Sequence, residues 1–261
     1  MASVSDSQFD FSFALRPIWL AGHVVALVAV VIFFLFGSWQ LGRLDERRET
    51  NETIQERTFG PPMALADAVA LWQETPSEVE YQRIAVGGTY RFEDEFFVGP
   101  SSLDGASGFR VVTPLEANGR VVMVVRGWVS LDTAGPPLAG EVRSGPGVVD
   151  GYVLRDEATF RGVPRLGNDV GAGRAGRIDI ATLAPVPDPV PFYIVQQLPE
   201  EGVRALGDPS FDEGRHLSYA FQWFAFSGVT AIGYVVLMVR TGTRRRSRRR
   251  PTASGAPRSA G

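Results

Sequence analysis

Residues Ile18 to Trp39 read IWLAGHVVALVAVVIFFLFGSW, an uninterrupted apolar run that decides the fold class of this chain. The run holds about 22 residues without a formal charge, and at 1.5 Å per residue it covers roughly 33 Å, enough for a bilayer core. Only Arg16, against Asp6 and Asp10, precedes it, and no small-residue cleavage site follows. An uncleaved membrane anchor is therefore favoured over a cleaved signal peptide.

A second apolar run lies near the other end, where Leu217 to Val239 reads LSYAFQWFAFSGVTAIGYVVLMV. It is also long enough to span, although a buried helical hairpin in a soluble protein remains the alternative. The tail beyond it is rich in arginine and has no acidic residue; its arginines are Arg240, Arg244, Arg245, Arg246, Arg248, Arg249, Arg250 and Arg258. The positive-inside rule places this tail in the cytoplasm, and two spans then place the N-terminus there as well.

The two runs divide the chain into five expected segments. They are a cytoplasmic N-terminal tail (1–17), a transmembrane helix (18–41), an extracytoplasmic domain (42–214), a second transmembrane helix (215–239) and a cytoplasmic arginine-rich tail (240–261). The arginine tail can be read as a nucleic-acid arm, but a topology determinant that touches anionic lipid is the more ordinary interpretation. We expect membrane lipid as a partner and no nucleic acid.

The composition excludes several classes of site. The chain has 261 residues, a net charge of -3, two histidines and no cysteine. The absence of cysteine removes thiol nucleophiles, disulfides, covalent haem attachment and thiolate metal sites, and it disfavours copper delivery. Both His23 and His216 lie in or beside apolar runs, so the sequence offers no soluble Ser-His-Asp site. The absence of lysine, with many Ala, Gly and Val residues, hints at a GC-rich bacterial genome.

The region between the spans predicts an α+β fold, mainly antiparallel β with short helices, in which sequence neighbours pair. The expected elements are a helical extension of the first span or a stalk at Asp45–Arg57, a short helix Met63–Trp72 closed by Thr75 and Pro76, strands Tyr81–Tyr90, Phe96–Val98, Phe109–Leu115, Arg120–Leu131, Val148–Arg155 and Val190–Leu198, a loop Pro136–Gly147, and a short helix or turn Ile178–Leu183. The glycine-rich stretch Gly167–Gly176 is interpreted as a plain loop rather than a phosphate cradle.

One hairpin is marked by its turn residues. Asn118 and Gly119 separate the strands Phe109–Leu115 and Arg120–Leu131. Both residue types tolerate the positive φ angles of a tight hairpin turn. The sequence therefore predicts that these two strands pair directly.

Three separated motifs carry a resemblance to a known family. They are Gly37-Ser38-Trp39-Gln40 with Arg43, then Thr113-Pro114 with Arg126-Gly127-Trp128-Val129, and then the run from His216 to Phe224. By their order and spacing the chain resembles the Surfeit locus protein 1 family over nearly its whole length. It departs from the family pattern at Glu46, where an aromatic residue is usual, and at Ser130, where proline often stands.

The resemblance implies a chaperone rather than a catalyst. Members of that family assist the assembly of haem-copper cytochrome c oxidases, and bacterial members are associated with binding or delivering haem a. The implied partners are the oxidase catalytic subunit and the machinery that makes haem a, with haem a as a transient cofactor. The implied location is the bacterial plasma membrane, as a multi-pass protein with both termini cytoplasmic.

The residues themselves suggest where haem would bind. In the predicted topology Trp39, Gln40 and Arg43 end the first span at the same outer membrane face at which the second span begins. The second helix presents His216, Tyr219, Ala220 and Trp223 on one stripe, with Gln222 nearby. A haem needs an axial ligand, apolar walls and a cation for its propionates, roles that suit His216, Trp39 with Trp223, and Arg43, with Arg215 as a second cation. The alternative interpretation is that these are ordinary residues of the membrane interface.

Two other readings of function stay open. One is an interaction scaffold that steadies an oxidase assembly intermediate without binding haem. The other is a receptor whose outer domain binds a small ligand, which the short arginine tail disfavours because no output domain follows it in this sequence. His23 lies about 25 Å along the first helix from Gln40, so a helix-packing or interfacial role is expected for it and not a shared haem with His216.

Overall fold

The computed structural model describes residues 12–138, 144–159 and 170–249. The chain divides into two compact units, residues 1–49 with 212–261 and residues 50–211. The first unit holds most of helix α1 (Pro17–Phe59) and all of helix α5 (His216–Arg249), and the second holds a β-domain.

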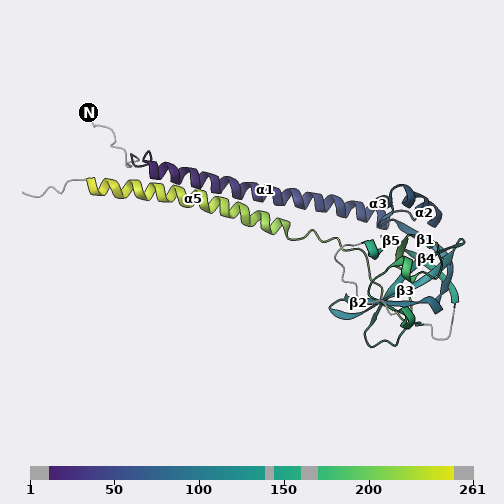
Figure 1. The fold of residues 1–261 in the computed structure, drawn as a ribbon. Coiled ribbons are helices and arrows are strands. Elements are labelled where there is room, and N and C mark those ends of the chain that lie inside the picture. Colours follow the sequence, from purple (N-terminus) through teal and green to yellow (C-terminus); the bar gives the residue numbers. More distant parts are fainter. Residues whose placement is uncertain (1–11, 139–143, 160–169, 250–261) are drawn as a thin grey trace, which may run out of the picture. The chain divides into compact units, whose positions relative to one another are not determined.

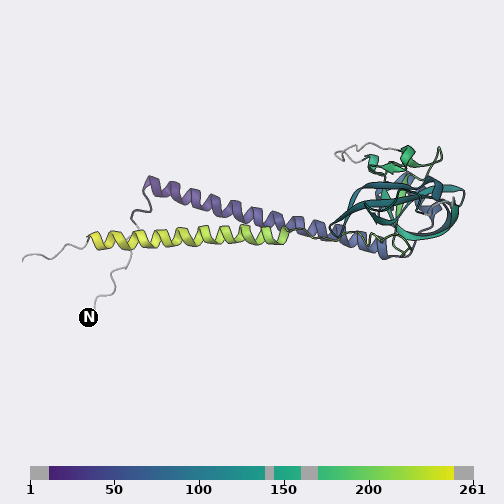
Figure 2. The same ribbon diagram turned by 90° about the horizontal axis from the view of Figure 1, so that it is seen from below.

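Helices α1 and α5 contain the two predicted apolar runs, and both are long and apolar enough to cross a membrane. They lie side by side and antiparallel (Figures 1 and 2), since Gln40 meets His216 near one end and His23 meets Tyr234 near the other. An added Cβ at Gly37 would lie 2.6 Å from the ring of Phe224, so glycine there lets the helices approach closely.

The predicted extension of the first helix beyond the apolar run is confirmed. Helix α1 continues without a break to Phe59, and Gly60, Pro61 and Pro62 follow it. Within the second unit its last turns are tied to the β-domain, because Arg57 Nη1 donates to the carbonyl of Ser77 at 2.7 Å. Asn51 Nδ2 likewise donates to the carbonyl of Phe211 at 2.9 Å.

Among its described residues the β-domain has seven strands and three short helices. The strands are β1 (Arg83–Arg91), β2 (Phe96–Leu103), β3 (Ala106–Ala117), β4 (Arg120–Ser130), β5 (Ser144–Arg155), β6 (Arg174–Ala175) and β7 (Phe192–Gln196). The helices are α2 (Leu65–Glu74), α3 (Pro76–Val79) and α4 (Ile180–Leu183), with short 3-10 turns at Phe92–Asp94, Glu157–Thr159 and Val170–Ala172.

The sheet closes on itself. Its strand order is β1-β5-β7-β4-β3-β2-β6, and β1 also pairs with β3 through Thr89 and Tyr90. Strands β1, β5, β7, β4 and β3 therefore form a ring, in which β4 and β7 are parallel and the other neighbours antiparallel. This cyclic order is that of the five-stranded Greek-key barrel known as the OB-fold.

The predicted class, α+β with two apolar helices, is correct, but the predicted pairing is wrong in part. Most pairs are antiparallel, yet β4–β7 and β2–β6 are parallel, so the sheet is mixed. Strand β5 does not pair with its predecessor β4; it lies between β1 and β7. The closed barrel accounts for the separation of β4 from β5, because β7, the last strand in the sequence, lies between them and pairs with both.

The predicted hairpin is confirmed. Strands β3 and β4 pair from Gly108 with Ser130 to Ala117 with Arg120. At the turn between them Asn118 has a φ of 52° and Gly119 a φ of 72°. The positive φ expected from the dipeptide is therefore present at both positions.

Several predicted boundaries need correction. The loop Pro136–Gly147 is wrong at its end, since β5 begins at Ser144 and pairs with Arg91 of β1. Thr75 ends α2, but Pro76 then opens α3, as proline does at a first helical position. Met63 pairs with Ile84 as an isolated bridge instead of starting the helix.

The glycine-rich stretch Gly167–Gly176 was expected to be a plain loop, and its first three residues lie outside the described part of the chain. Its remainder is not plain loop, because Val170–Ala172 forms a 3-10 turn and Arg174–Ala175 pairs with β2.

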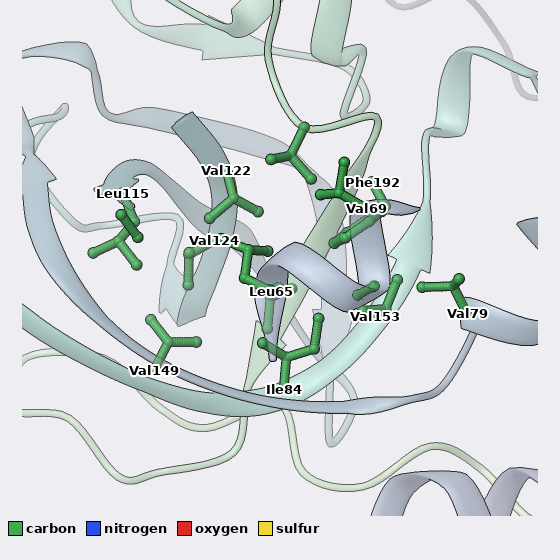
Figure 3. Close-up of a cluster of buried hydrophobic side chains, with 14 of the residues drawn as sticks. Leu65, Val69, Val79, Ile84, Leu115, Val122, Val124, Val149, Val153 and Phe192 are labelled. Atoms are coloured by element: carbon green, nitrogen blue, oxygen red, sulfur yellow. The ribbon is translucent and has the colours of Figure 1, made fainter. Parts of the chain in front are cut away.

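The barrel interior is an apolar core closed at one end by α2. Side chains from all five barrel strands converge with those of α2 and α3 (Figure 3); the labelled ones are Leu65, Val69, Val79, Ile84, Leu115, Val122, Val124, Val149, Val153 and Phe192. The outer face of β4, β7 and β5 is buried in turn under the segment that contains α4, through Ile178, Ile180 and Leu183. These strands are apolar on both faces, as strands covered on both sides are.

Candidate functional site

The predicted stripe on α5 does not form one uniform surface. The helix begins at His216, which is partly buried, and Trp223 two turns later is also partly buried. Ala220 is buried with 1% of its surface exposed, whereas Tyr219 is 47% exposed. The stripe therefore divides into a face toward α1 and a face away from it.

His216 is joined to the end of the first apolar run. Its Nδ1 lies 2.9 Å from Oε1 of Gln40 across the two helices. A carbonyl-type oxygen only accepts hydrogen bonds, so this contact is a hydrogen bond in the tautomer that has its proton on Nδ1 and its lone pair on Nε2. The structure thus brings together two of the predicted site residues.

Trp223 lies in an aromatic cluster that the sequence did not single out. Its ring centroid is 5.0 Å from that of Phe36, 5.8 Å from that of Phe33 and 5.9 Å from that of Phe226. Phe33 and Phe36 lie about one helical turn apart on α1, and Trp223 and Phe226 have the same separation on α5. The helical spacing of these aromatic residues in the two apolar runs was the available signal for the cluster. Spacing alone does not show which faces of the two helices are in contact.

Other predicted site residues point outward. Trp39 is 59% exposed, and Gln222 is also exposed. Arg43 forms an ion pair with Glu46, three residues ahead on its own helix, and both side chains are more than half exposed. The departure from the family pattern at Glu46 thus supplies a partner for Arg43. Such an exposed pair is weak, so an anionic ligand could displace Glu46.

The segment before α5 is held against α1 by a second set of charges. Arg48 makes a bidentate ion pair with Glu213, with distances of 3.0 and 3.1 Å, and Arg47 Nε donates to the carbonyl of Asp212 at 3.2 Å. The hydrogen bond and charge of Arg48 lower the pKa of Glu213. These contacts fix the start of α5 just before His216.

His23 lies at the other end of the helix pair. One ring nitrogen is bonded to the hydroxyl of Tyr234, and the other is 3.2 Å from the carbonyl of Ala14. Of the two roles expected for His23, helix packing or the membrane interface, the bond to Tyr234 of α5 supports the first, and the other ring nitrogen contacts the segment before α1.

The β-domain contains a buried ionic cluster that sequence reasoning missed. Arg126 of β4 donates to Glu95 Oε2 at 2.6 Å and to Glu200 Oε1 at 2.8 Å, and its side chain is 7% exposed. Thr113 Oγ1 donates to the same oxygen of Glu95 at 2.7 Å. The guanidinium also lies 5.3 Å from the ring of Tyr90. The motif residues Thr113 and Arg126 thus converge on one carboxylate.

The rest of the Arg126-Gly127-Trp128 motif holds the segment that leads from β7 toward α5. Trp128 and Arg204 exchange backbone hydrogen bonds of 2.7 and 2.9 Å. An added Cβ at Gly127 would lie 2.6 Å from the carbonyl oxygen of Arg204, so only glycine allows this approach. The motif therefore holds residues 200–204 against the β3–β4 hairpin through hydrogen bonds.

The surface of the β-domain carries an open hollow of about 430 Å³ beside this cluster. It is lined by Glu93, Asp94, Glu95, Phe96, Pro136, Pro137, Gly171, Ala172 and Gly173. No histidine is among these lining residues, so the hollow offers no imidazole to haem iron. This hollow does not fit the predicted cofactor.

The chain is similar to proteins of one family. The model of the SURF1 family matches residues 27–228. Over 239 residues, 84% of this chain and 88% of the relative, it is 29% identical to a SURF1-like protein of Monosiga brevicollis. It is 27% identical over 233 residues to an uncharacterized SURF1-like protein of Mycobacterium tuberculosis, covering 85% of this chain and 84% of that one.

A shorter similarity concerns a yeast protein. Over 108 residues, 41% of this chain and 27% of that protein, the chain is 26% identical to the cytochrome oxidase assembly protein SHY1 of Saccharomyces cerevisiae. The family model extends from within the first apolar helix into the second and so includes the β-domain and all three sequence motifs. The chain therefore belongs to the SURF1 family, as its motifs predicted.

Proposed function

We propose that the protein is a membrane-bound assembly factor for a haem a-containing cytochrome c oxidase, and that it assists haem a insertion into the catalytic subunit. Family membership and the oxidase-assembly role named for the yeast relative support the part that concerns oxidase assembly. The part that concerns haem a rests on the residues around His216. The proposed action is holding and release, without turnover.

The observation that carries the haem proposal is the bond between His216 and Gln40. In the part of the chain that the structure describes it leaves Nε2 of His216 without a hydrogen-bond partner, and such an imidazole nitrogen is the usual protein ligand of haem iron. The aromatic cluster of Trp223, Phe33 and Phe36 supplies apolar surface in the same helix pair. Bound haem a would supply iron that accepts this imidazole; the protein's own residues bind it, exclude water and hold its charged edge.

Cations for the propionates stand near the same helix ends. Arg43 follows Gln40 by about one helical turn and forms an exposed ion pair with Glu46. Arg215 immediately precedes His216 and is exposed. Trp39, Tyr219 and Gln222, all exposed on these helices, would face the haem edge or the oxidase subunit.

The proposal includes a topology. The arginine-rich tail lies in the cytoplasm of a bacterial cell, both termini are cytoplasmic, and the β-domain faces outward. The catalytic subunit of the oxidase is the proposed partner, with haem a handed over from the enzymes that make it. An interaction scaffold that does not bind haem is the competing function.

The test is a visible spectrum of the protein purified from haem a-producing cells. Wild-type protein should carry haem a, and His216→Ala should lose most of it or shift its spin state. The variant should still insert into the membrane and co-purify with the catalytic subunit, because no contact within the β-domain is altered. His23→Gln is the matched control and should retain haem, since His23 lies at the other end of the helix pair, bonded to Tyr234.

The Arg43→Ala variant tests the role of a propionate partner separately from that of the proposed iron ligand His216. Loss of a propionate partner should weaken haem retention by about 1–3 kcal/mol, the worth of a charge-assisted hydrogen bond, without changing the axial-ligand spectrum. If wild-type protein carries no haem, or if His216→Ala keeps a full complement with an unaltered spectrum, the scaffold function takes the place of the carrier.

A further inference from the structure

Gln40 is placed to control the chemical form of His216. Its side-chain oxygen lies 2.9 Å from Nδ1, and both residues are partly buried where α1 and α5 meet. A neutral imidazole carries one N–H, and the nitrogen that bears it is fixed by the hydrogen bond it makes. An acceptor at Nδ1 therefore selects the tautomer in which Nε2 has a free lone pair.

The surroundings hold this pair in register. Gly37, about one turn before Gln40, brings α1 close to Phe224, and beyond Gln40 the ion pair of Arg48 with Glu213 ties down the segment that precedes His216. Gly214 lies beside the Cδ2–Nε2 edge of the imidazole, where an added Cβ would be 3.5 Å from Nε2. Its φ of 71° favours glycine, so the edge bearing the free lone pair is not covered by a side chain from that position.

The chemical nature of the partner matters as well as its position. Ligating histidines usually donate their second N–H to a carboxylate or a carbonyl, which fixes ring orientation and raises ligand basicity. A carboxylate is the stronger acceptor, because charge-assisted hydrogen bonds are roughly twice as strong as neutral ones. An amide oxygen orients the ring with a smaller gain in basicity.

We propose that Gln40 is the positioning residue of this site: it holds His216 with its proton on Nδ1 and Nε2 free, and its uncharged amide keeps iron binding weak enough for release. The inference rests on the proposed function and adds a reason why a carrier uses glutamine at this position. A carrier must give its cargo to the oxidase, so a ligand of maximal strength would work against it.

The first experiment needs no haem. Full-length protein with ¹⁵N-labelled histidine, in detergent micelles at mildly alkaline pH, gives imidazole signals from only two histidines, and His23→Gln assigns them. Wild-type His216 should be protonated at Nδ1 and unprotonated at Nε2. Gln40→Glu should keep this form, whereas Gln40→Leu should lose it. A proton on Nε2 in wild type, or an unchanged His216 signal in Gln40→Leu, overturns the positioning role.

The second experiment measures haem in protein from haem a-producing cells. Gln40→Leu should reduce haem retention by about 10–100-fold, the usual effect of losing such a partner. Gln40→Glu should retain haem more tightly than wild type, with a more negative midpoint potential and slower transfer to the catalytic subunit. Equal haem retention and equal midpoint potential in wild type, Gln40→Leu and Gln40→Glu would overturn the proposal that Gln40 sets the strength of iron binding.

The two experiments fail separately. Haem-free wild-type protein whose His216 tautomer depends on Gln40 would overturn the proposed function and the tuning, and would leave the positioning of the imidazole established. Haem-loaded wild-type protein with an insensitive tautomer would support the proposed function and overturn the role of Gln40.

Discussion

Glu95 has no exposed side-chain surface, and its buried charge is tolerated because both carboxylate oxygens accept hydrogen bonds. Its Oε1 accepts the backbone N–H of Leu138 at 2.7 Å, and its Oε2 accepts from Thr113 and Arg126. Glu200 lies on the other side of the same guanidinium and is 26% exposed. The guanidinium of Arg126 therefore compensates the buried charge of Glu95 on one side. On the other side it holds, through Glu200, the segment that follows β7.

This division predicts unequal costs of substitution. Arg126→Met should destabilise the protein by about 3–5 kcal/mol, because it leaves Glu95 as an unpaired buried charge. Glu200→Gln should cost only about 1–2 kcal/mol, since Arg126 keeps its bond to Glu95. Thermal unfolding in detergent measures both, and limited trypsin cleavage at Arg204 should become faster in Glu200→Gln. Equal losses of stability in the two variants would contradict this account.

A second residue-scale prediction concerns acid. Burial alone would raise the pKa of Glu157, but the hydrogen bonds and charge of Arg110, aided by Ile178 N–H and Tyr193, outweigh burial and lower it from its usual 4.5. Because the folded-state pKa is the lower one, this stabilisation is present above pH 4.5 and is lost as the pH falls through the folded-state value. Unfolding experiments in wild type and Glu157→Gln should show the stability gap closing below that pH. A gap that stays constant into acid would show that Glu157 does not ionise differently on folding.

At the scale of elements, the β3–β4 hairpin depends on its turn. Replacing Asn118 and Gly119 with valine should cost about 2–4 kcal/mol, because β-branched residues resist the φ values of 52° and 72° found there. Asn118→Gly is the matched control and should unfold at nearly the wild-type temperature. A melting temperature that does not fall in the double valine variant would be inconsistent with the observed turn.

The same hairpin links the sequence motifs to the rest of the domain. Strand β3 carries Thr113 and β4 carries Arg126, and their register places both beside Glu95. Strand β4 also pairs with Arg204 beyond its barrel contacts. The hairpin is thus the element onto which the segment leading toward the second apolar helix is fastened.

At the scale of the whole molecule, the arginine tail predicts orientation. A reporter that is active only outside the cytoplasm should work when inserted at Gly105, which is exposed in the turn between β2 and β3. The same reporter should fail when fused after Arg250, because the positive-inside rule keeps that end in the cytoplasm. A reporter active in the cytoplasm should give the complementary pattern, and reversed activities at the two positions would invert the topology.

Local patterns determined much of this protein. The length of two apolar runs predicts two long helices, and a dipeptide with positive φ predicts the hairpin, because both signals lie within a few residues of what they control. The sequence also named His216, Gln40 and Trp223 as candidate site residues, since each stands in a recognisable motif at the edge of an apolar run or within it. Neither the bond between His216 and Gln40 nor the ring contacts of Phe33 and Phe36 with Trp223 followed from those motifs.

The tertiary structure decided what depends on distant partners. The parallel pairing of β4 with β7 follows from barrel closure, which no strand carries in its own pattern. The partners of Arg126 lie 31 and 74 residues away, and Gln40 and His216 are 176 residues apart. A charge or an amide can pair with any complementary group that folding brings within about 3 Å, so its residue type predicts a need for a partner without identifying it. The sequence alone thus determined the helices, the hairpin and the family, and the tertiary structure decided the barrel, the contact of residues 200–204 with the β3–β4 hairpin and the pairing of His216 with Gln40.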